Sequence, residues 1–84
     1  MTKKELKAFF EEHMVPSNLY KIGGSKHKRI CLEKSGGGWD VFFSEHRNKI
    51  GVLHYDDEAS ACLSMKNEIR KLMEQLYGLT WVAN

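Results

Sequence analysis

The segment WDVFFSE, residues 39–45, has the composition of a β-strand and anchors the prediction of the whole fold. Aromatic and β-branched side chains fit the pleated surface of a sheet, and they dominate this segment. Alternation along a strand places Phe42 on one face and Trp39, Val41 and Phe43 on the other. Each face therefore carries an aromatic side chain. We expect one of these faces to meet something other than packed helices.

Turn signals on both sides of this segment predict further strands. The run SGGG at 35–38 precedes it, and Asn48 follows it. Glycine and asparagine tolerate the positive φ angles that tight hairpin turns need. Extended segments are expected at 19–23, 29–34, 39–45 and 49–55. Hairpin connections between them predict antiparallel pairing.

Amphipathic patterns at the two ends of the chain predict helices. Thr2 and Glu5 have capping-box spacing at the start of a helix over 2–14, which Pro16 stops. A second helix opens at Asp56-Asp57-Glu58, where acids complement the helix dipole, and ends at Gly78. The predicted class is α+β in the order α-β-β-β-β-α. An antiparallel sheet of three to four strands carries both helices on one face, and the apolar stretch 79–82 folds back on it.

Length and composition indicate one globular domain over residues 1–84. The chain is 42% hydrophobic and 29% charged, which excludes a disordered polymer. The net charge of +2 is too small to predict nucleic-acid binding by itself. The sequence shows no apolar signal-peptide region and no run of membrane-spanning length, so we expect a cytoplasmic protein without membrane contact. Cys31 and Cys62 should then be reduced and buried.

The side chains that could carry catalysis or hold a metal are scattered. The four histidines have no zinc-site spacing, and no Cys-x-x-Cys is present. His54 with Asp56 or Asp57 would make an oriented base, but no strained turn presents a nucleophile beside them. We therefore expect no enzyme, no metal and no cofactor. A small enzyme built around His54 and Asp56 stays as a third hypothesis.

A basic cluster gives the main alternative to protein binding. Its members are Lys26, Lys28, Arg29 and Lys34. Basic side chains beside a sheet with aromatics can follow phosphates, which suggests a small RNA-binding module with an α-β-β-β-α fold. The acidic run 56–58 at the start of the last helix would repel phosphate. A nucleic-acid partner is therefore disfavoured against a protein partner.

Residues 39–49 followed by 57–62 resemble one group of bacterial immunity proteins, which belong to contact-dependent growth inhibition and polymorphic-toxin systems. The shared pattern is a Gly-Gly turn, a tryptophan-led aromatic strand, a Glu-Arg-Gly turn and an acidic helix start with Ala-Cys. The segments 23–24 and 32–34 also fit. This sequence departs at the third feature, because His46 separates Glu45 from Arg47 and Asn48 stands where glycine is expected.

The resemblance implies a non-enzymatic cytosolic protein that binds and blocks the toxic domain of a cognate toxin, a nuclease in many such systems. Inhibitors of nucleases commonly present acidic groups to a basic cleft. Aromatic side chains are the residue types that anchor interfaces. We expect a monomer or weak homodimer. The candidate partner-binding residues are Glu33, Trp39, Asp40, Phe42, Glu45, Arg47, Tyr55, Asp56, Asp57 and Glu58.

Overall fold

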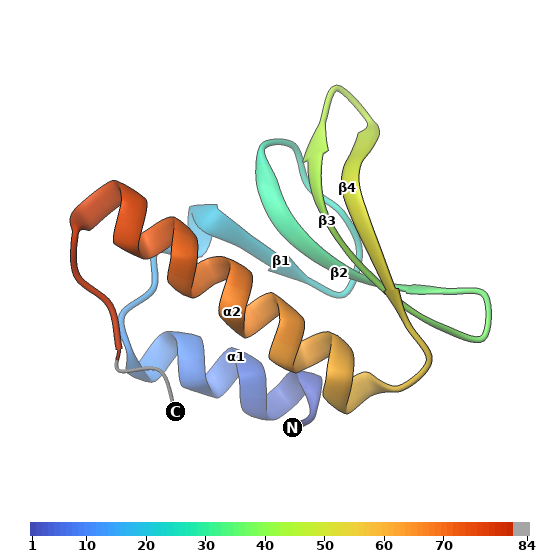
Figure 1. Cartoon of the computed structure of the whole chain (residues 1–84), viewed down its shortest axis with the longest axis horizontal. Helices are drawn as coiled ribbons and strands as arrows, with labels where there is room; N and C mark the ends of the chain where they lie inside the picture. The colour runs from blue at the N-terminus through green and yellow to red at the C-terminus, as the bar shows by residue number, and fades with distance from the viewer. Residues whose placement is uncertain (82–84) are drawn as a thin grey trace.

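A computed structural model describes residues 1–81 and shows two helices side by side across one face of a four-stranded sheet (Figure 1). This confirms the α+β class, the element order and the placement of both helices. The elements, in chain order, are α1 (Lys3–Glu12), a 3₁₀ turn η1 (Ser17–Leu19), β1 (Tyr20–Ile22), β2 (Arg29–Ser35), β3 (Gly38–Glu45), β4 (Asn48–Tyr55) and α2 (Glu58–Tyr77).

The helix ends follow the local signals in the sequence. At the start of α1, the Glu5 backbone N–H donates to Thr2 Oγ1 at 3.2 Å, and the Thr2 N–H donates to Glu5 Oε1 at 2.8 Å. Asp57 caps α2 by accepting from the Ser60 N–H at 3.0 Å. Gly78 ends α2 in a left-handed conformation. These interactions join residues at most four apart, which is why the sequence pattern predicted them.

The first strand corrects the prediction of a purely antiparallel sheet. The strand order is β1-β2-β3-β4, and β2, β3 and β4 pair antiparallel, but β1 pairs parallel with β2. Residues 23–28 do not form a hairpin. They return across the sheet face opposite the helices, where the Lys26 N–H donates to Cys31 Sγ at 3.5 Å. The chain therefore enters β2 from the same end at which it entered β1.

The core lies between the helices and the sheet. Trp81 returns to α1 and packs against Phe9, with ring centroids 5.0 Å apart. The predicted fold-back is thus confirmed for Trp81, while Leu79 stays exposed and Val82 lies outside the described residues. Among residues 1–81, no helix has both the length and the apolar character needed to cross a bilayer. The buried core residues are Leu6, Phe10, Val15, Leu32, Val41, Ala61, Cys62, Met65 and Ile69.

A bulge in β4 decides which of its side chains face the helices. Val41 pairs with Leu53 and Phe43 pairs with Ile50, so β4 has one extra residue between these two pairs. Gly51 lies in this stretch with φ +65°, a conformation that glycine adopts without strain. Because of the extra residue, Ile50 and Leu53 share the helix side of the sheet although their numbers differ by three.

Candidate functional site

Strand β4 forms an exposed edge of the sheet. It is the last strand in the sheet order, and Ile50, Val52 and Leu53 are 48%, 44% and 43% exposed. Figure 1 shows α2 beginning beside the end of β4 and running away from it, so the first half of β4 lies beyond the helix. A long edge strand with exposed apolar side chains marks a surface suited to pairing with another chain.

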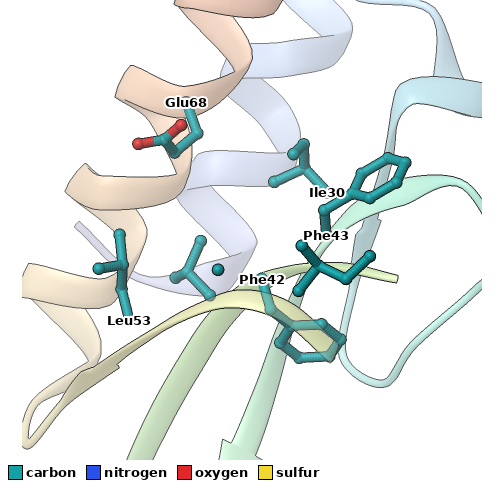
Figure 2. Close-up of a pocket in the computed structure, with 8 residues that line it drawn as sticks. Ile30, Phe42, Phe43, Leu53 and Glu68 are labelled. Carbon is teal, nitrogen blue, oxygen red and sulfur yellow. The ribbon is translucent and has the colours of Figure 1, made fainter. Parts of the chain in front are cut away.

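A groove lies between this edge and α2, on the helix side of the sheet. We call it the α2–β4 groove; its volume is about 310 Å³. Figure 2 shows Ile30 and Phe43 on one side of it, Leu53 on the other and Glu68 of α2 above. Leu53 and Glu68 also line a second hollow that reaches Leu63. The two hollows share Leu53 and Glu68. The groove is lined mainly by apolar side chains, whereas polar side chains, including Lys71, make up most of the second hollow.

The opposite face of the sheet carries a charge cluster, which consists of Glu33, Asp40, Lys49 and His54. His54 Nδ1 lies 2.7 Å from Asp40 Oδ1, and Lys49 Nζ lies 2.8 Å from Glu33 Oε1 and 3.7 Å from Asp40 Oδ2. The hydrogen bond from His54 holds the pKa of Asp40 below its usual range. The Glu33 carboxylate raises the pKa of Lys49. These contacts therefore favour the ionised Asp40 carboxylate and the protonated Lys49 ammonium group.

The charge cluster has the geometry of a structural contact between strands. Asp40 holds His54 Nδ1, and His54 Nε2 lies 3.8 Å from Asp56 Oδ1. An Asp–His pair can orient a general base, which needs a nucleophile to act on. The two cysteines are poor candidates for that nucleophile, because burial raises the pKa of the Cys31 and Cys62 thiols and so disfavours the reactive thiolate. Within residues 1–81, no three potential metal ligands gather at one place.

The predicted aromatic anchors are engaged within the protein. Trp39 lies under the ammonium groups of Lys3 and Lys34, at 4.8 and 5.4 Å from the ring centroid. The Tyr55 hydroxyl donates to Ser64 Oγ at 2.9 Å. Phe42 is buried on the open face, with its ring pointing away from the groove (Figure 2). These three side chains hold the sheet, its helices and its open face together.

The predicted acidic residues divide into structural and exposed groups. Asp57 is the α2 cap, and Glu58 Oε2 accepts from the Lys3 N–H at 2.9 Å, which joins the starts of the two helices. Asp56 is fully exposed beside them. Glu45 ends β3 and Arg47 lies in the β3–β4 turn, at the opposite end of β4 from Asp56, so the structure does not bring them to Asp56.

The predicted basic cluster is also divided. Arg29 Nη1 donates to the Ser17 carbonyl at 3.0 Å, and Lys34 lies near the other end of β2 against Trp39. Lys34 lies five positions beyond Arg29 along the extended strand, so their Cα atoms are roughly 17 Å apart. Lys26 instead lines a hollow with Arg47 from the β3–β4 turn. Lys26 therefore lies near Arg47, which is distant in sequence, and not in one cluster with Arg29 and Lys34.

The exposed apolar residues in and around the groove were missed by sequence reasoning. Ile50 and Leu53 line the groove, Leu63 lines the second hollow, and Val52 is their exposed neighbour on β4. The sequence did contain a signal for these residues. The fourth strand has apolar residues at both odd and even positions around Gly51, whereas a strand with one covered face needs apolar residues at alternate positions only.

No family model, curated protein or solved structure matches this chain.

Proposed function

We propose that the chain is a non-enzymatic protein-binding domain that neutralises a cognate toxin in the cytoplasm, and that the toxin domain docks on the α2–β4 groove and the edge of β4. The observation that carries this proposal is the exposure of Ile50, Val52 and Leu53 on an edge strand beside an apolar groove. Such an edge offers backbone N–H and C=O groups to an added strand, and the groove offers pockets for alternate side chains.

The class of partner follows from the resemblance of residues 39–49 and 57–62 to immunity proteins. The exposed Asp56 carboxylate near the end of β4 supports a basic partner, whereas Glu68 at the groove lies 3.7 Å from Lys71 Nζ. A cytoplasmic setting also fits Cys31 and Cys62, which are both free thiols. Electrostatic attraction would speed the encounter, while the apolar groove would supply most of the binding free energy.

The RNA-binding alternative has less support. Arg29 is engaged by Ser17, Lys34 lies against Trp39, and Asp56 and Asp57 bring negative charge to the start of α2. An RNA-binding surface requires several phosphate contacts along one track. The basic residues named in the sequence do not line such a track.

Co-expression tests the proposal directly. If the gene next to the one for this chain encodes a toxin domain, that domain is expressed with the chain in a host cell, and growth and co-purification are measured. We expect the wild type to rescue growth and the double variant Val52→Lys, Leu53→Asp to lose rescue. The affinity of the double variant for the toxin domain should fall at least about 30-fold, as expected when interface hot spots are lost. Leu79→Asp is the matched control, because Leu79 is 77% exposed and lies outside the groove.

Two results would count against the proposal. Full rescue by the folded double variant would show that the toxin does not dock on the groove and the edge of β4. Failure of the wild type to bind or neutralise the neighbouring toxin domain would remove the toxin as the partner. Circular dichroism of both variants shows whether the domain is still folded, so a loss of rescue is not mistaken for unfolding.

A further inference from the structure

A third hollow lies on the other side of the sheet, where the loop before β2 meets the turn between β3 and β4. We call it the loop pocket. The Lys28 N–H donates to the Ser44 carbonyl at 2.6 Å, and the His46 N–H donates to His27 Nδ1 at 3.1 Å. These two hydrogen bonds fix the loop against the turn. The pocket has a volume of about 490 Å³ and is lined by Ser25, Lys26, His27, Ser44, His46 and Arg47.

Positive charge is concentrated around the loop pocket. Residues 23–28 and 46–47 contain three basic side chains and no acidic one, whereas the rest of the chain has ten basic and eleven acidic side chains. The nearby acid is Glu45, whose Oε1 lies 3.9 Å from His46 Nε2, and it does not line the pocket. The pocket is therefore a local positive site on a molecule whose remainder is net negative.

The lining groups are hydrogen-bond donors of the kinds that bind oxyanions. Because His27 Nδ1 accepts from the His46 N–H, the proton of the neutral His27 ring is on Nε2, which can donate. Lys26 contributes an ammonium group and Arg47 a guanidinium fork that matches phosphate oxygens. Ser25 and Ser44 add hydroxyl groups. A tetrahedral oxyanion accepts several hydrogen bonds and so matches a pocket lined by such donors.

The backbone around the pocket is unusual for the residues that it carries. His46 and Arg47 occupy the two central positions of the hairpin turn with φ of 49° and 66°, and Lys28 has φ 57°. Glycine and asparagine are the usual residues at such turn positions. Here histidine and arginine occupy them instead, which places two donor side chains against Lys26 and His27.

We propose that the loop pocket binds the phosphate group of a small phosphorylated ligand. A single phosphate site is favoured over a nucleic-acid track, because Arg29 and Lys34 do not extend the pocket along the sheet. The pocket and the α2–β4 groove lie on opposite faces of the sheet. The phosphate site is thus independent of the toxin-docking proposal.

Titration of the ¹⁵N-labelled full chain with pyrophosphate tests this inference. Ionic strength is held constant with sodium chloride, and amide shifts are followed by NMR. We expect saturable shifts at residues 25–28 and 44–47. Lys26→Ala and Arg47→Gly should each weaken binding about tenfold, the effect of losing one charge-assisted hydrogen bond. Arg47→Gly keeps a residue that tolerates positive φ, so the turn is preserved.

Lys34→Ala is the matched control, because Lys34 is equally basic and lies away from the pocket. Unchanged affinity in the Lys26→Ala, Arg47→Gly double variant would overturn the inference, as would equal shifts with chloride alone. A twelve-nucleotide single-stranded RNA forms the second arm. Tighter binding of this RNA than of pyrophosphate, weakened equally by Lys26→Ala and Lys34→Ala, would assign the site to a nucleic-acid backbone and overturn the small-ligand inference.

Discussion

The two faces of the sheet are buried in different ways. On the helix side, Leu32 and Val41 are covered by apolar side chains of α1 and α2. On the open side, Phe42 and Cys31 are just as inaccessible, yet no helix covers them in the part of the chain that the structure describes. Lys49 Nζ lies 4.7 Å from the centroid of the Phe42 ring, and the loop at 23–28 covers Cys31. The comparison shows that burial alone does not reveal what stabilises a face.

The difference has an energetic consequence. Removal of apolar surface from water stabilises the helix side, and this term depends little on pH or salt. Hydrogen bonds and ion pairs hold the open side, so its contribution should be smaller and should change with both.

Leu32→Ala should produce the largest loss of stability. Leu32 is fully buried under the helices, and deletion of its side chain leaves a cavity. We expect the free energy of unfolding in urea to fall by about 2–5 kcal/mol. Leu79→Ala is the control and should change it by less than about 0.5 kcal/mol. Equal effects of the two substitutions would show that the helix side is not the stabilising face.

Gly38→Ala should destabilise the junction of β3 and β4. A Cβ at Gly38 would meet the Tyr55 carbonyl oxygen and would lie 3.0 Å from His54 Nε2. One strand has to move, and we expect a loss of about 1–3 kcal/mol in thermal or urea unfolding. Gly37→Ala is the matched control, since a Cβ there meets open space. If Gly38→Ala has the same free energy of unfolding as the wild type, β4 can shift at this contact without a loss of stability.

Asp40→Asn should remove a pH-dependent part of the stability. His54 lowers the pKa of Asp40 in the folded protein, so the contribution is fully present above the ordinary aspartate pKa and is lost as pH falls through the lowered value. We expect the variant to be about 1 kcal/mol less stable at pH 7 and to converge with the wild type near pH 2.

Urea unfolding at several pH values between 7 and 2 measures this convergence. Asp56→Asn is the control, because the Asp56 side chain is fully exposed and lies 3.8 Å from His54. A constant difference between Asp40→Asn and the wild type over the whole interval would contradict an electrostatic origin.

Lys49→Met should have the smallest effect. Methionine keeps an apolar chain over the Phe42 ring and removes the ion pairs to Glu33 and Asp40. We expect a loss below about 1 kcal/mol that shrinks further in 1 M salt. Lys49→Ala also uncovers Phe42 and should cost more than Lys49→Met. A larger loss of stability in Lys49→Met than in Lys49→Ala would show that Lys49 acts mainly through its charge and not by shielding the Phe42 ring from water.

The site was less predictable than the fold. Glu33, Asp40 and Asp56 were predicted as partner-binding acids, and the structure places Glu33 and Asp40 in the charge cluster with Lys49 and His54. Lys49 and His54 were not expected there, because the contacts depend on the pairing of β2, β3 and β4. Trp39, Phe42 and Tyr55 satisfy the composition of an interface, yet packing has already engaged them. Residue type alone does not distinguish an anchor from a core side chain.

The sequence by itself determined the helices, their caps and the strands, because capping, turn preference and hydrophobic period act between residues a few positions apart. The local patterns correctly predicted the capping box of Thr2 with Glu5, the N-cap at Asp57 and the C-terminal end of the second helix at Gly78. Only the tertiary structure decided the parallel pairing of β1, the bulge at Gly51 and the meeting of His27 with His46. Strand direction, register and loop placement arise from contacts between distant residues, and the free energies of the alternatives depend on the whole packed arrangement.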